Sequence, residues 1–131
     1  MVRISQDRTP AKLERWRTIL VNAAKQCRRS TIPTLHPPRE CREVCEAVES
    51  DLKLLLQASP RAMPLKRLLR GKSWSSVAFA VGPEGGWTGD ECETFLRSGF
   101  QAVQLGLSTL RTETAATVAA ALLRYELFPE N

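Results

Sequence analysis

The sequence lacks the long apolar runs and metal-ligand spacings that define several protein classes. No apolar stretch among its 131 residues approaches the roughly 20 residues of a membrane-spanning helix. Its four cysteines form no C-x-x-C pair, and its one histidine, His36, lies among prolines, so the spacing argues against a zinc site. Charges occur throughout the N-terminal region, unlike the apolar core of a signal peptide. These absences predict a soluble, cytoplasmic protein without a metal.

The size and composition are those of an ordinary single domain, but the charge is unevenly distributed. Residues 1–72 contain 16 Lys and Arg against 7 Asp and Glu, whereas residues 73–131 contain 3 against 7. The basic clusters are Arg15 with Arg17, Lys25 with Arg28 and Arg29, and Lys66, Arg67 and Arg70 with Lys72. Such clusters suit a polyanion because neutralised phosphates release their counterions. Solvated helix faces without a partner are an equally good explanation of the charge alone.

Hydrophobic spacing predicts helices that alternate with short strands, and therefore an α/β fold with a largely parallel sheet. In chain order, the predicted elements are a strand at 1–4, a helix at 11–28, a short β-leaning segment at 30–35, a helix that starts at Pro37-Pro38, a strand at 52–56, a short helix at 64–69, a strand at 77–81, a helix from about 88 to 98, a strand at 100–105 and a helix from about 112 to 127. Cys41 and Cys45 lie four residues apart on a predicted helix, where core packing is the expected role.

The stretch VAFAVGPEGGWTG, residues 77–89, predicts a buried strand, a glycine-rich loop and a helix start. Three glycines within five residues allow unusual backbone angles and close approach of a ligand. Thr88 and Glu91 match a capping box, which begins the helix. The loop is neither a dinucleotide fingerprint nor a P-loop, and Glu84 would repel a phosphate. A structural turn without a ligand remains the alternative.

A second strand and loop follow, and they place Arg111, Thr112, Glu113 and Thr114 together before the last helix. In parallel sheets the carboxyl ends of strands meet at one edge, where ligands bind. Helix capping explains most of this polar set, since Thr112 and Thr114 are good caps and Glu113 suits the first turn. Capping does not explain Arg111, whose charge is unfavourable there.

Both loops resemble those of a known family. GPEGGWTGDE (82–91), LGLSTLRTETA (105–115) and the helical segment KLERWRTILVNAAKQCRRSTIP (12–33) resemble the small-subunit ribosomal RNA uracil-N3 methyltransferases of the SPOUT superfamily. The resemblance runs from about Lys12 to Leu127. It implies a parallel-sheet SPOUT-type fold with a C-terminal deep trefoil knot, a homodimer and a ribosomal RNA substrate. Residues 1–131 would form the methyltransferase domain without its first strand and helix and without the family's N-terminal RNA-binding barrel.

The resemblance also implies a cofactor, S-adenosylmethionine, held largely by backbone groups of the loops. Carried over by position, its contacts would be Leu56, Gln57, Val81, Gly82, Pro83, Glu84, Gly85, Gly86, Leu105, Gly106, Leu110, Arg111 and Thr114. Glycines would admit the cofactor, and apolar leucines would flank its adenine.

The reaction implied is methyl transfer to N3 of a uridine in small-subunit ribosomal RNA. Arg111 is the candidate that holds the uracil or a phosphate and offsets developing negative charge. Glu84 or Glu113 would accept the N3 proton or balance the sulfonium, and the sequence does not choose between them. Arg15, Lys25, Arg28 and Arg29 are the candidate RNA-binding residues. The alternative is a non-catalytic RNA-binding or ribosome-assembly module derived from such an enzyme. A different nucleotide-binding enzyme is weakly supported, because its motifs are missing.

Overall fold

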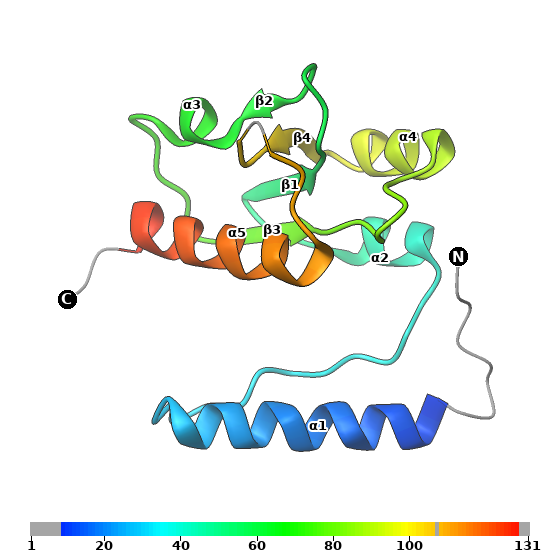
Figure 1. Cartoon of the computed structure of the whole chain (residues 1–131), viewed down its shortest axis with the longest axis vertical. Coiled ribbons are helices and arrows are strands. Elements are labelled where there is room, and N and C mark those ends of the chain that lie inside the picture. Colours follow the sequence, from blue (N-terminus) through cyan, green and yellow to red (C-terminus); the bar gives the residue numbers. More distant parts are fainter. Residues whose placement is uncertain (1–8, 107, 129–131) are drawn as a thin grey trace. The chain divides into compact units, whose positions relative to one another are not determined.

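The computed structural model describes residues 9–106 and 108–128 (Figure 1). These residues form two compact units, which divide between Glu40 and Cys41. The first unit contains helix α1 (Thr9–Gln26), close to the predicted range. Beyond it, Arg28 has a left-handed φ of 55°, a conformation that commonly ends helices. The strand predicted at 1–4 lies outside the described residues.

The segment that follows α1 is irregular, so two predictions there are wrong. Residues 30–35 form no strand, because a strand needs a partner for its backbone groups and Pro33 has no N–H to donate. The next helix, α2 (Cys41–Ala47), begins at Cys41 and not at Pro37-Pro38. A proline disfavours the helical conformation in the residue before it, which keeps Pro37 extended.

The second unit is built on a four-stranded sheet in which every neighbouring pair is parallel, as predicted. Its strands are β1 (Leu52–Leu56), β2 (Met63–Pro64), β3 (Val77–Ala80) and β4 (Gln101–Gln104), in the order β2-β4-β1-β3. Sequence reasoning missed β2, whose two residues are too short to produce a periodic pattern. β3 was expected to be buried, but its residues are half-buried because β3 lies at an edge of the sheet.

Helices cover both faces of the sheet (Figure 1). On one face, Leu52, Leu54 and Leu56 of β1 share a core with residues of α3 (Leu65–Leu69) and α5 (Thr112–Leu127). On the other face, Leu55 packs with residues of α2 and α4 (Gly89–Arg97). The alternation follows from strand geometry, since successive side chains point to opposite faces.

Helix α4 begins and ends as its sequence predicts. The Thr88 hydroxyl accepts a hydrogen bond from the Glu91 N–H at 3.2 Å, and the Glu91 carboxylate accepts one from the Thr88 N–H at 2.8 Å. This reciprocal pair is a complete capping box. Gly99 follows the helix with a φ of 87°, which glycine adopts without strain.

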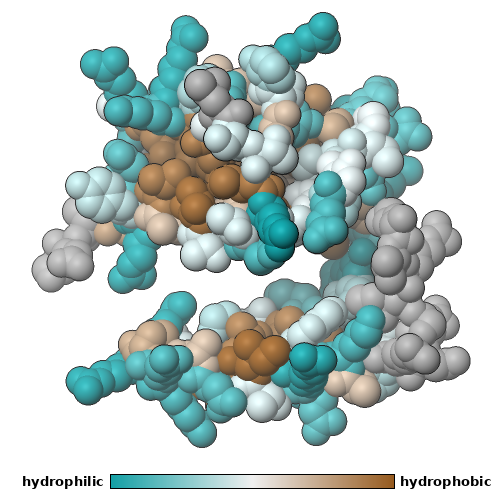
Figure 2. All heavy atoms as spheres, viewed as in Figure 1, coloured by the Kyte–Doolittle hydropathy of each residue, from teal (hydrophilic) through white to brown (hydrophobic). Residues whose placement is uncertain are grey.

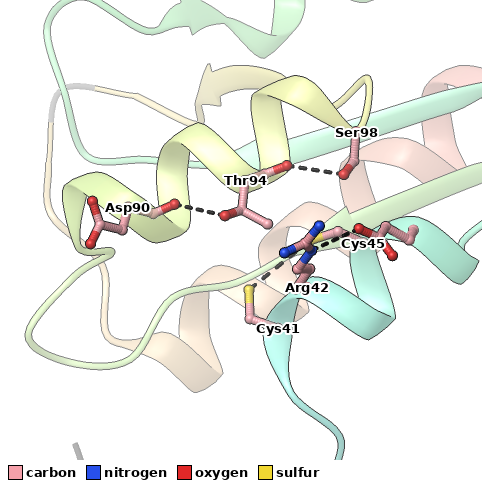
Figure 3. A network of polar contacts seen from close by, with 7 residues as sticks. Cys41, Arg42, Cys45, Asp90, Thr94 and Ser98 are labelled. Atoms are coloured by element: carbon pink, nitrogen blue, oxygen red, sulfur yellow. Dashed lines mark hydrogen bonds and ion pairs between the residues drawn. The ribbon is translucent and has the colours of Figure 1, made fainter.

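Helices α2 and α4 carry local polar contacts along their turns (Figure 3). In α2 the Cys41 and Cys45 sulfur atoms are 4.0 Å apart, and Arg42 pairs with Glu46 at 2.9 Å. Cys45 is buried in the core with Cys41 packed beside it, so the predicted core role of this pair is confirmed. Burial raises the pKa of the Cys45 thiol to about 12, which keeps it protonated and unreactive at neutral pH.

Candidate functional site

Three loops meet around one cavity at the carboxyl edge of the sheet. They follow β1, β3 and β4, whose parallel course brings their carboxyl ends to the same edge. The cavity has a volume of about 760 Å³, within the range of ordinary small-molecule sites. The lining residues that the structure describes are Leu56, Gln57, Ala58 and Ser59 at and after the end of β1, Val81, Gly82, Pro83, Glu84, Gly86 and Trp87 after β3, and Val103, Leu105, Gly106, Ser108, Thr109, Leu110, Arg111, Thr112 and Ala115 around the third loop.

Most residues predicted as cofactor contacts line this cavity together. Gly85, Thr114 and the candidate base Glu113 do not line it. A Cβ atom at Gly85 would meet no atom within 4 Å, so packing within the chain does not require glycine there. Glycine is needed instead at Gly86, which has a φ of 77°, and at Gly82, where a Cβ atom would crowd Trp87.

Trp87 joins the glycine-rich loop to the end of β1, a role that the sequence did not reveal. Its indole N–H donates a hydrogen bond to the Leu56 carbonyl at 3.0 Å. A Cβ atom at Gly82 would lie 3.1 Å from the same indole, which is tighter than most real contacts. The ring also meets Phe95 edge-on, with centroids 4.8 Å apart. Trp87 therefore fixes the position of the loop against the strand and against the core.

Thr112 connects the third loop to the second. Its hydroxyl donates a hydrogen bond to the Gly82 carbonyl at 2.9 Å. The capping roles considered for Thr112 and Thr114 are wrong, because the N-cap of α5 is Arg111 and no side chain caps the helix. No local sequence signal indicates this bond, because it joins residues 30 positions apart.

Two charged side chains line the cavity from opposite loops. Glu84 belongs to the loop after β3 and Arg111 to the loop before α5, and both residues are exposed. Neither forms a salt bridge with another residue in the described part of the chain. The Glu84 carboxylate is therefore available to a positively charged group of a ligand, and the Arg111 guanidinium to a negatively charged group.

Gln57 provides a further polar group at the end of β1. Its backbone N–H donates to the Val103 carbonyl at 2.9 Å, which continues the pairing of β1 with β4. Its side-chain amide contacts the Cys92 sulfur at 2.8 Å. Cys92 belongs to α4, so this helix orients the Gln57 side chain, which lines the cavity.

The described residues contain neither a candidate metal site nor a candidate membrane span. No three histidine, cysteine, aspartate or glutamate side chains are grouped closely enough there to hold a metal ion. None of the helices described is both long and apolar enough to cross a membrane.

The fold and the cavity define a ligand-binding α/β domain with its site at the carboxyl edge of a parallel sheet. Residues 1–124 match the RNA methyltransferase domain family, and the chain belongs to that family. The family resemblance read from the two loops is thereby confirmed.

Relatives of known name are similar over most of this chain. The ribosomal RNA small subunit methyltransferase E of Synechocystis is 37% identical over 113 residues, which are 84% of this chain and 37% of that protein. The protein of the same name from Mycobacterium bovis is 37% identical over 114 residues, 82% of this chain and 42% of that protein. The chain spans less than half the length of these curated relatives.

Solved structures are similar in fold. A Legionella pneumophila protein, described as a methyltransferase with the bound cofactor SAM, is 30% identical with a TM-score of 0.85 over 95% of this chain and 50% of that one. The ribosomal RNA small subunit methyltransferase E of Neisseria gonorrhoeae, bound to S-adenosyl methionine, is 36% identical with a TM-score of 0.83 over 92% of this chain and 50% of that one.

The hydrogen bond from Trp87 can be tested by replacing the residue with phenylalanine. Trp87→Phe keeps a ring near Phe95 but leaves the Leu56 carbonyl without its donor, so the free energy of unfolding should fall by about 1–2 kcal/mol beyond the loss of ring volume. Urea unfolding of this variant beside Trp74→Phe measures the difference. Trp74 is also partly buried against the core, but its indole forms no hydrogen bond to a described residue. Equal losses in both variants would contradict the role of the bond.

Proposed function

We propose that this chain is the S-adenosylmethionine-dependent catalytic domain of an RNA methyltransferase that methylates N3 of a uridine in small-subunit ribosomal RNA. The observation that carries this proposal is the cavity formed by the loops after β1, β3 and β4 in a member of the RNA methyltransferase domain family. Its support includes the structural similarity to two proteins with this cofactor bound. The non-catalytic alternative is not favoured, because the cavity is formed within this chain.

The cavity fits S-adenosylmethionine in size and in chemistry. Its volume of about 760 Å³ exceeds what a nucleoside needs, and its walls combine apolar side chains with loop backbone. Leu105 and Leu110 would flank the adenine, and Gly82 and Gly86 would let backbone amides approach its polar edges. The carboxylate of Glu84 would balance the sulfonium charge. When bound there, the cofactor would supply the methyl group.

The residues of this chain would position the uracil and take its proton. The N3 proton must leave as the new N–C bond forms, so the site needs a base and a group that stabilises negative charge. We assign the first role to Glu84, which lines the cavity, in preference to Glu113, which does not. Glu113 lies in the first turn of α5, where a carboxylate stabilises the helix dipole. Arg111 would hold the uracil or an adjacent phosphate.

Four cations of the first unit are proposed to contact the RNA. Arg15, Lys25, Arg28 and Arg29 are all exposed. None of the four forms a salt bridge with a described carboxylate, so their charges are available to phosphates.

A trefoil knot and a cytoplasmic location are the finer parts of the proposal. The family resemblance implies that the chain before α5 is threaded, and the bond from Thr112 to Gly82 supports close passage of the third loop beside the second. When the chain is unfolded by pulling on its two ends, a knot would shorten the extended length. A measured extension equal to the full contour length would exclude the knot.

Cofactor binding can be tested at Gly86. Alanine is strained at a φ of 77° by about 1–2 kcal/mol, so Gly86→Ala should shift the loop and weaken S-adenosylmethionine binding about tenfold. Gly89→Ala is the matched control, because its Cβ also meets open space but its backbone is helical. Isothermal titration measures both affinities. Unaltered affinity in Gly86→Ala would place the cofactor elsewhere, and no binding by the folded wild-type chain would contradict the cofactor assignment.

The role of Arg111 can be tested by methyl transfer. At saturating cofactor, Arg111→Ala should lower the rate of methylation of small-subunit ribosomal RNA by about 100-fold, the effect typical of a lost charge-stabilising donor. Arg97→Ala is the control, since Arg97 is exposed on α4 and pairs with Glu93. Incorporation of labelled methyl groups measures the rate. The assignment would be wrong if Arg111→Ala methylated RNA at the wild-type rate.

The end of α5 is proposed to form a homodimer contact. Leu122 is 40% exposed and Tyr125 is 82% exposed, and Phe128 follows with 46%. Figure 2 also shows apolar surface beside α5 and α3. Such a cluster favours contact with another protein surface. We expect sedimentation of a dimer at micromolar concentration, and of a monomer for Leu122→Glu with Tyr125→Glu. A wild-type monomer would refute this contact.

A further inference from the structure

The larger unit carries a second feature, a basic surface formed by Arg61, Lys66, Arg67, Arg70 and Lys72. This set is called the α3 basic surface below. All five residues are exposed. The sequence contains no aspartate or glutamate between Asp51 and Glu84, so no acidic residue is interspersed among them. Figure 2 shows hydrophilic side chains projecting from the end of this unit that carries β2 and α3.

The charge of this surface is not compensated within the described chain. No salt bridge joins any of the five cations to a described carboxylate, whereas Arg42 and Arg97 on other helices each pair with a glutamate one turn away. The Asp51 carboxylate, at the near end of the acid-free stretch, accepts a hydrogen bond from the Ser75 N–H instead. An external anion would therefore meet unpaired cations.

Helix α3 carries this charge at a cost to its own stability. Its first turn contains no acidic residue, and Pro64 at the N-cap makes no side-chain hydrogen bond. Lys66 and the C-cap residue Arg70 are one turn apart, which adds like-charge repulsion. A bound polyanion would offset this repulsion.

The helix of the α3 basic surface packs into the core that borders the cavity. Leu65, Leu68 and Leu69 are buried in the same core cluster as Leu56 and Val103. Leu56 and Val103 both line the cavity. The inner face of α3 therefore belongs to the same core as part of the cavity wall, and its charged residues are exposed to solvent.

Arg61 extends the surface toward the cavity. Ser59 lines the cavity, and its carbonyl accepts a hydrogen bond from the Ala62 N–H at 3.0 Å, which closes a turn around Arg61. The Gln104 amide donates to the Ala62 carbonyl at 2.9 Å and ties this turn to the end of β4. One residue, Pro60, separates Arg61 from Ser59 at the cavity wall, and two residue steps span at most about 7 Å.

We propose that the α3 basic surface binds the phosphodiester backbone of the RNA strand whose nucleotide enters the cavity. The inference rests on the proposed function and adds a second RNA contact, separate from the cations of the first unit. Flexible lysine and arginine side chains bind the phosphates of a nucleic acid, and such contacts do not select a particular base sequence. The surface would hold the strand while Arg111 holds the target.

The test compares pairs of substitutions that each remove two positive charges from the full chain. Lys66→Gln with Arg67→Gln should lower the slope of log affinity against log salt by about 1.4 for a fluorescently labelled oligouridylate, which is single-stranded. Raising salt from about 50 to about 200 mM should then cost the wild-type chain about sevenfold more affinity than this variant. The control pair, Arg42→Gln with Arg97→Gln, should keep the wild-type slope. Fluorescence anisotropy measures binding.

Several results would overturn the proposal. A wild-type slope in the Lys66 and Arg67 variant would do so, as would a loss confined to Lys25→Gln with Arg28→Gln in the first unit. Binding of the wild type to phosphatidylserine vesicles but not to RNA would point to a membrane instead. Titration of the same variants with S-adenosylmethionine separates this failure from that of the proposed function, since unchanged cofactor affinity would leave the catalytic assignment standing.

Discussion

Complete enclosure of β1 is the constraint on which the rest of the larger unit depends. It has a parallel neighbour on each side and helices on both faces, and Leu54 and Leu55 have no exposed surface. Its side chains cannot change face without moving an entire core cluster. The carboxyl end of β1 therefore becomes a fixed point in the unit. The Leu56 carbonyl at that point receives the Trp87 indole, and the glycine-rich loop takes its position from this bond.

Local chemistry explains which parts of the fold could be predicted. The capping box at Thr88, the glycine after α4 and the apolar run of β1 each depend on a few adjacent residues, and all three are present in the structure. Elements that depend on distant partners could not be predicted in this way. β2 exists because two residues pair with β4, and β3 is half-buried because it lies at an edge of the sheet.

The candidate site also has features that adjacent residues predict and features that depend on distant partners. The strand-loop-helix pattern placed the glycine-rich loop and Arg111 at one edge, and both line the cavity. The choice among neighbouring residues needed three-dimensional information. Thr112 bonds a loop 30 residues away, and Gly85 faces open space although the adjacent Gly86 is constrained by its backbone. Motifs thus identify a loop, whereas the role of each residue in it depends on the segments that the fold brings beside it.

The packing of Trp87 against Gly82 couples the sizes of two residues that are five positions apart. The indole occupies the space that a side chain at position 82 would need. Natural or designed sequences with alanine at 82 should therefore carry a smaller ring at 87, and the two positions should vary together. A smaller ring without an indole N–H would also lose the bond to Leu56, so the volume of one side chain and the attachment of the loop to the sheet cannot be optimised separately.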